Sequence, residues 1–208
     1  MTMVSDFDAA FARCPLVAIL RGVRPDEVEA IGEELVAAGF TLIEVPMNSP
    51  DPLDSVARLA KRFEGRAIIG AGTVLDVDGV AAVQAAGGTM VISPNMNPRV
   101  IAATAAAGLV SLPGIATPSE AFLALETGAT ALKLFPAEAA SPVILKAMRA
   151  VLPKTVRVLP VGGITPEGMA PWTAAGAAGF GLGGALYSVG ATAEQVGANA
   201  RAFIAALK

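Results

Sequence analysis

A single lysine stands in the middle of a short apolar segment, ALKLFPAE at residues 131–138. Burial in such a segment disfavours the ammonium form of Lys133 and lowers its pKa, which frees the nitrogen lone pair. A neutral lysine is the nucleophile that forms Schiff bases with carbonyl substrates. The other interpretation of Lys133 is a side chain that reaches solvent along its apolar stem, or one half of a buried ion pair with Glu44.

Glu44 lies in a second apolar segment, TLIEVP. On its own, a carboxylate in this position would usually be a helix cap or a salt-bridge partner. Beside a neutral amine in an apolar pocket, its pKa should rise toward the range that suits general acid and base catalysis. We therefore predict that Lys133 and Glu44 form a catalytic pair.

The chain contains no histidine, which excludes a catalytic histidine, a triad built on histidine and a metal centre with histidine ligands. Its one cysteine, Cys14, cannot form an intrachain disulfide and has no histidine to activate it. We expect a small buried residue there, in a reducing compartment. A lysine-dependent mechanism remains the leading prediction.

The elements that must position this pair recur along the chain. Alanine-rich segments end at glycine and a β-branched or leucine-rich segment follows at once, about every twenty residues, as in VAAGF, QAAGG, AAAGL, LETGA and TAAGA. The pattern predicts eight strands, at residues 17–21, 41–45, 67–71, 90–93, 109–112, 131–135, 156–160 and 179–183. An extra helix at about residues 4–13 precedes them. Eight alternating strands and helices favour an α/β fold, a (β/α)8 TIM barrel, as a single domain over residues 1–208.

In such a barrel the active site lies at the carboxyl ends of the strands. Arg21 and Thr73 also stand at predicted strand ends, so we expect them to join Glu44 and Lys133 there. Because side chains alternate along a strand, this convergence requires certain faces to point inward. Arg21 would share its inward face with Ile19, and Glu44 with Leu42. Thr73 would share its face with Ile69 and Ala71, and Lys133 with Ala131 and Phe135.

Two glycine pairs follow the last two predicted strands, Gly162 and Gly163 in VGGIT and Gly183 and Gly184 in GLGGALY. In barrels of this kind the loops after the last two strands commonly bind phosphate through backbone N–H groups. Tight turns or close strand packing are the alternative explanation of each pair. Their occurrence on both expected strands favours a phosphate site.

Composition points to a small-molecule partner. The chain of 208 residues is 54% apolar with a net charge of −3 and no long basic run, so we expect no nucleic-acid partner. The uncharged stretches 100–119 and 168–193 are rich in alanine and glycine, which favours tight packing over membrane insertion, and we expect no membrane partner. The start, MTMVSDFDAA, lacks the layout of a secretion signal, so we expect a cytoplasmic protein.

These motifs together resemble the 2-keto-3-deoxy-6-phosphogluconate (KDPG) and 6-phosphogalactonate aldolase family. The segments concerned are AILRG, IEVPMNSP, IGAGTVL, ISPN, LPGIATPSE, LKLFPAE, PVGGITPE and GLGGALY, and they cover nearly the whole chain. The resemblance implies a class I aldolase without metal or other cofactor. Such an enzyme cleaves a phosphorylated 2-keto-3-deoxy sugar acid to pyruvate and glyceraldehyde 3-phosphate. It also implies a homotrimer.

The resemblance assigns roles by position. It implies that Lys133 forms the Schiff base, that Glu44 is the general acid and base working through a water, and that Thr73 binds the pyruvyl carboxylate. It implies that Arg21 binds the substrate. Gly162, Gly183 and the residue at 184 match the phosphate site.

Two positions bear on specificity. Gly184 stands where relatives have serine, so a hydroxyl contact to phosphate would be lost. Asn48 stands where phosphogluconate-type members commonly have arginine, which favours the galactonate branch over the gluconate epimer or an enzyme that serves both. The further alternatives are another phosphate-binding barrel, such as an epimerase or a decarboxylase, and a non-catalytic barrel that binds a sugar phosphate for regulation.

Overall fold

The computed structural model describes residues 3–207. Its strands are β1 (Leu16–Ile19), β2 (Leu42–Pro46), β3 (Ile68–Gly72), β4 (Met90–Ile92), β5 (Val110–Leu112), β6 (Gly114–Ile115), β7 (Leu132–Leu134), β8 (Val158–Pro160) and β9 (Phe180–Leu182). Its helices are α1 (Met3–Arg13), α2 (Val28–Ala38), α3 (Pro52–Arg62), α4 (Val77–Ala85), α5 (Pro98–Ala106), α6 (Pro118–Thr127), α7 (Pro142–Arg149), α8 (Met169–Ala174) and α9 (Ala193–Ala206), with a short 3-10 helix η1 (Ala137–Ala139). None of the helices within this range is long and apolar enough to cross a membrane.

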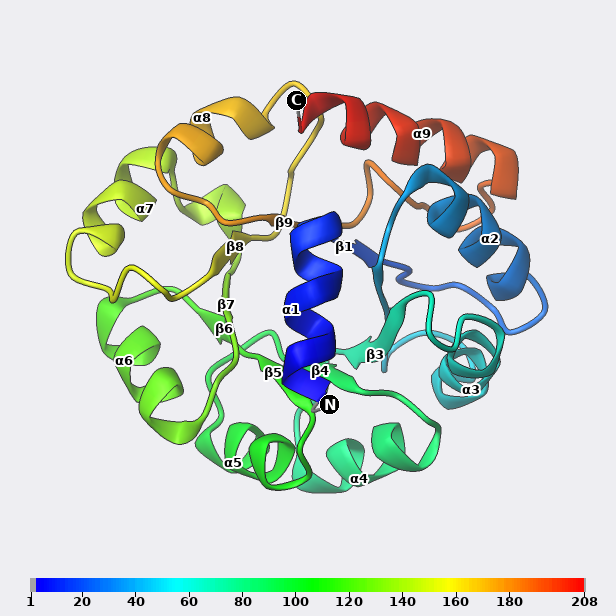
Figure 1. Ribbon diagram of the computed structural model, residues 1–208, viewed down its shortest axis with the longest axis horizontal. Helices are drawn as coiled ribbons and strands as arrows, with labels where there is room; N and C mark the ends of the chain where they lie inside the picture. Colours follow the sequence, from blue (N-terminus) through cyan, green and yellow to red (C-terminus); the bar gives the residue numbers. More distant parts are fainter. Residues whose placement is uncertain (1–2, 208) are drawn as a thin grey trace.

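The strands close into a parallel barrel. One sheet has the order β5-β4-β3-β2-β1-β9 and the other the order β6-β7-β8. Pro113 separates β5 from β6, which together take the place of the fifth predicted strand, and Lys133 N–H donates to the Pro113 carbonyl at 2.9 Å. A bridge between Val161 and Gly181 joins β8 to β9 and completes the ring. The helices α2 to α9 surround this ring (Figure 1), which confirms the predicted TIM barrel.

The extra helix is also confirmed, and it closes one end of the barrel. Figure 1 shows α1 lying across that end, at the centre of the ring. Phe7 and Phe11 of this helix pack against the interior residues Val17 and Leu42. Thr41, directly before β2, donates its hydroxyl hydrogen to the Ala10 carbonyl at 2.8 Å. The helix therefore covers the end where the strands begin, and a substrate must enter at the opposite end.

Local signals in the sequence explain where several helices begin and end. Asp76 accepts a hydrogen bond from Gly79 N–H at the start of α4, and Thr117 forms a capping box with Glu120 at the start of α6. Gly39 and Gly128 end α2 and α6 in the left-handed conformation that glycine adopts most readily. The caps at Asp76 and Thr117 fix the positions at which the loops of the carboxyl end enter α4 and α6.

Candidate active site

Lys133 occupies the middle of β7, with Gly114 of β6 and Leu159 of β8 as its register partners. Only 5% of the residue is exposed, so it does not reach solvent along its stem. Its Nζ lies 4.6 Å from the centre of the Phe135 ring. Burial lowers the pKa of Lys133, and the nearby Arg21 lowers it further, while Glu44 opposes both effects. A larger fraction of this lysine is therefore neutral than for a lysine in water.

Glu44 lies in β2, opposite Ile19 of β1 and Gly70 of β3, and is 1% exposed. Its Oε2 has no hydrogen-bond partner among the residues that the structure describes. Burial raises the pKa of this carboxyl to about 7, although Lys133 and Arg21 act in the opposite direction. At neutral pH Glu44 can therefore both accept and donate a proton.

Lys133 and Glu44 line one small cavity inside the barrel, with a volume of about 10 Å³. The rest of its wall is apolar: Val17, Ile19, Ile92, Leu112, Leu159, Val161 and Gly181. The Lys133 Nζ lies more than 4.0 Å from both Glu44 carboxyl oxygens, so the two groups share an apolar cavity without forming an ion pair.

Gly72 makes room for the Glu44 carboxyl, a role that the sequence analysis missed. A Cβ atom at position 72 would overlap both carboxyl oxygens of Glu44. The signal that could have pointed to it is the pair of glycines in the buried strand segment IIGAG, because glycine inside a strand often marks a close approach of another group.

Arg21 lies at the rim of the barrel. β1 ends at Ile19, so Arg21 belongs to the turn that follows rather than to the predicted strand 17–21, and its side chain is exposed. Its Nη1 donates a hydrogen bond to Asn48 Oδ1 at 2.7 Å. The next residue, Gly22, donates its N–H to Ser49 Oγ at 2.9 Å. Two loops are thereby joined, and the guanidinium is held close enough to affect the pKa of both Glu44 and Lys133.

For Thr73 the predicted inward face is wrong. Ile69 and Ala71 belong to the outer core, between the strands and the helices, whereas Gly70 and Gly72 face the interior residues Met90 and Glu44. β3 ends at Gly72, and Thr73 then has φ 55°, in the left-handed region. This change of backbone direction breaks the alternation of side chains on which the prediction depended. Thr73 is half-buried at the carboxyl end of β3.

The two glycine pairs meet at the same end of the barrel, since Val161 and Gly181 are paired directly before them. The backbone N–H groups of Gly162, Gly163, Gly183 and Gly184 have no acceptor among residues 3–207. A Cβ at either Gly183 or Gly184 would meet nothing within 4 Å, so close packing does not explain that pair.

Close packing does apply to Gly162, against which the Glu138 carboxylate lies. Glu138 belongs to η1, which follows β7. Gly162 and Gly163 also have φ values of 117° and 63°, which favour glycine. Gly162 and Gly163 are therefore required by the shape of this loop, and the same loop offers free N–H groups to a ligand.

Comparison with known proteins agrees with this geometry. A 2-dehydro-3-deoxy-6-phosphogalactonate aldolase of Escherichia coli (strain K12) is 43% identical over 196 residues, which are 94% of this chain and 96% of that protein. A 2-dehydro-3-deoxy-phosphogluconate aldolase of Treponema pallidum (strain Nichols) is 31% identical, over 83% of this chain and 81% of that protein.

A solved structure described as native KDPGal superposes with a TM-score of 0.92 at 44% identity, covering 94% of this chain and 95% of that one. The model of the KDPG and KHG aldolase family matches residues 7–199. Fold, sequence and family model agree over almost the whole chain. The protein belongs to the KDPG and KHG aldolase family.

Proposed function

We propose that this protein is a class I aldolase that cleaves 2-dehydro-3-deoxy-6-phosphogalactonate to pyruvate and glyceraldehyde 3-phosphate. The observation that carries the proposal is the shared apolar cavity in which Lys133 has a lowered pKa and Glu44 a pKa near 7. Imine formation on a ketone needs a neutral amine as the nucleophile and a nearby group that can donate and accept a proton near neutral pH. Lys133 and Glu44 fit these two roles.

In the proposed mechanism, the Lys133 amine adds to C2 of the substrate, and the C2 oxygen leaves as water with a proton from the Glu44 carboxyl. The resulting iminium draws the electrons of the C3–C4 bond as it breaks. The ionised Glu44 accepts the C4 hydroxyl proton, through a water, so that glyceraldehyde 3-phosphate leaves as an aldehyde. Glu44 returns the proton to C3 of the enamine, and hydrolysis of the imine releases pyruvate and the free Lys133 amine.

We assign the remaining contacts by position. The free N–H groups of Gly162, Gly163, Gly183 and Gly184 bind the phosphate, for which unpaired amides at one rim are suitable donors. Thr73 binds the pyruvyl carboxylate, and Arg21 contacts the substrate from the rim. The homotrimer and the cytoplasmic location remain predictions; light scattering of the purified protein tests the first, and fractionation of cells tests the second.

The preference for the galactonate epimer is supported by Asn48. Its Oδ1 accepts a hydrogen bond from Arg21 at 2.7 Å. An arginine at position 48 would instead place two guanidinium groups together, and like charges at that distance repel. The rim of this barrel is therefore built for an amide at position 48. The second candidate is the gluconate epimer or an enzyme that serves both.

Incubation with pyruvate and borohydride, followed by peptide mass mapping, tests the mechanism. The expected result is a reduced pyruvate adduct on Lys133 and none in Lys133→Arg, whose guanidinium stays protonated. An unmodified Lys133 would overturn the mechanism. An epimerase, a decarboxylase or a non-catalytic barrel would release no pyruvate from either aldol substrate.

Pyruvate release from the two epimers, compared as kcat/KM, tests the substrate assignment. A higher value for the galactonate epimer is expected. Preference for the gluconate epimer would leave the aldolase mechanism intact and correct the substrate.

A further inference from the structure

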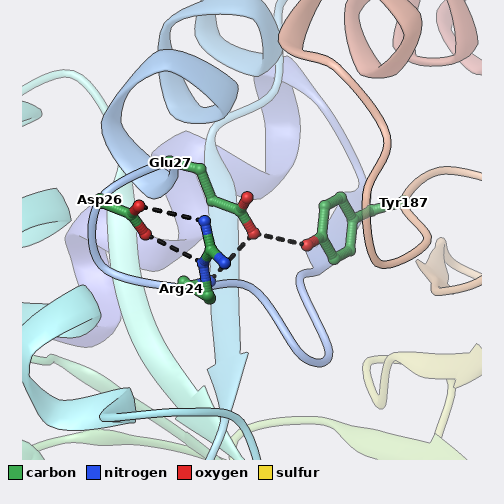
Figure 2. A network of polar contacts seen from close by, with 4 residues as sticks. All are labelled: Arg24, Asp26, Glu27 and Tyr187. Carbon is green, nitrogen blue, oxygen red and sulfur yellow. Dashed lines mark hydrogen bonds and ion pairs between the residues drawn. The ribbon is translucent and has the colours of Figure 1, made fainter.

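The loop after β1 and the loop after β9 are joined by a polar contact outside the cavity (Figure 2). Tyr187, on the loop after β9, is 3% exposed, and its hydroxyl donates to Glu27 Oε1 at 3.1 Å. The same oxygen accepts the Arg24 N–H at 3.1 Å. Glu27 thus connects its own loop to a residue 160 positions later in the chain.

A second contact joins the same two loops. Gly22 follows Arg21 and has φ 84°, and a Cβ at position 22 would lie 2.6 Å from Cγ2 of Val189. The loop after β1 therefore packs directly on the loop after β9, and glycine at position 22 suits both this close contact and the left-handed backbone. This packing brings the loop that carries Arg21 against the loop that carries the second glycine pair.

Tyr187 is also tied to that glycine pair. Its N–H donates to the Gly183 carbonyl at 3.0 Å, and the Leu186 N–H donates to the same oxygen at 2.8 Å. On the other side, Asn199 of α9 donates its side-chain amide to the Leu186 carbonyl at 3.1 Å. One hydrogen-bonded turn therefore separates the Tyr187 ring from the free amides of Gly183 and Gly184.

Figure 2 also shows an ion pair on the first loop, between Arg24 and Asp26. The closest atoms of this pair are 3.1 Å apart, and the two side chains are 61% and 70% exposed. Exposed pairs of this kind contribute little. It does not reach the second loop, and so it provides a matched control.

We propose that Tyr187 and Glu27 are positioning residues that hold the loop carrying Arg21 in register with the loop carrying Gly183 and Gly184. This inference rests on the proposed function, in which both loops contact the substrate. The contact favours one arrangement of the two loops, because the buried Tyr187 would lose the hydrogen-bond partner of its hydroxyl if Glu27 moved away. Neither residue lines the cavity of Lys133 and Glu44. The pair therefore acts on substrate binding and leaves the imine chemistry unaffected.

Tyr187→Phe keeps the ring and removes the hydroxyl. The expected result is a rise of about tenfold in KM for 2-dehydro-3-deoxy-6-phosphogalactonate and in the inhibition constant of inorganic phosphate, as for the loss of one charge-assisted hydrogen bond. The kcat should change less than about twofold, since the chemistry at Lys133 is untouched. The exchange of pyruvate methyl protons with deuterated water, which needs only the imine and Glu44, should stay at the wild-type rate.

Asp26→Asn, on the same loop, should match the wild type in all these measurements. In a double-mutant cycle, Glu27→Ala and Tyr187→Phe should be non-additive, the double variant having the KM of Glu27→Ala alone. Glu27→Ala also serves where Tyr187→Phe folds poorly, as judged by its melting temperature.

Two results would overturn the inference while the proposed function stands. One is an active wild type with an unchanged KM in Tyr187→Phe. The other is a loss of pyruvate exchange parallel to the rise in KM, which would mean that the pair supports the whole barrel. A wild-type protein that neither cleaves the substrate nor binds phosphate would overturn the proposed function and this inference with it.

Discussion

Glu44 should make the stability of this protein depend on pH in a defined direction. Burial raises its pKa from 4.5 to about 7 in the folded state, so the folded protein holds this proton more tightly than the unfolded chain does. The stability that this proton contributes is fully present below pH 4.5, falls as the pH rises, and is lost above 7. Each pKa unit corresponds to about 1.4 kcal/mol, so ionisation of Glu44 costs about 3 kcal/mol in the free energy of unfolding.

Glu44→Gln removes this cost. As the pH rises from below 4.5 to above 7, the free energy of unfolding of the variant should increase by about 3 kcal/mol relative to the wild type. Most of this change should occur between about pH 5 and pH 8. Loss of the Glu44 charge also lowers the pKa of Lys133 further. The buried Lys133 cation then destabilises the variant at low pH and is neutralised as the pH rises. This effect also makes the stability of the variant, relative to the wild type, increase with pH.

Urea unfolding of both proteins at pH 5 and pH 8, followed by circular dichroism, measures the difference. Glu167→Gln, at an exposed position, is the control and should show no such dependence. A stability difference between Glu44→Gln and the wild type that is the same at both pH values would refute the reasoning. It would mean that water or a neighbouring group solvates the Glu44 carboxylate as well as bulk water does.

Three substitutions test other parts of the structure. Gly72→Ala places a methyl group on the Glu44 carboxyl and should lower kcat by about 10²-fold, while pyruvate can still be trapped on Lys133; a kcat near the wild-type value would contradict the assigned role of Gly72. Gly184→Ser adds a hydroxyl into open space and should lower the KM of the phosphorylated substrate about fivefold in steady-state assays, whereas an unchanged or higher KM would argue against phosphate at this loop. Phe7→Ala empties a fully buried site of the barrel interior and should lower the free energy of unfolding by about 3–5 kcal/mol in urea denaturation, so a loss below about 1 kcal/mol would show that α1 is not needed to close the barrel.

Much of the fold could be predicted because its signals are local. Glycine helix ends, cap residues and apolar strand segments recur in each repeat, and they mark elements whatever the rest of the chain does. The same holds for Lys133 and Glu44, which are conspicuous because each is a charged residue in an apolar strand. The sequence alone therefore determined the barrel, its extra helix and the pair at the centre of the proposed chemistry.

Only the tertiary structure decided which side chains meet. The inward face of β3 is that of Gly70 and Gly72, because the strand register follows from packing against its neighbours. Thr73, directly after the strand, has a left-handed backbone that no local pattern announces. The Arg21–Asn48 bond and the Tyr187–Glu27 contact join loops that are 27 and 160 positions apart in the chain. Such contacts form only when the barrel assembles, which places β2 and β9 on either side of β1. Local sequence patterns mark single elements and do not show which loops will meet.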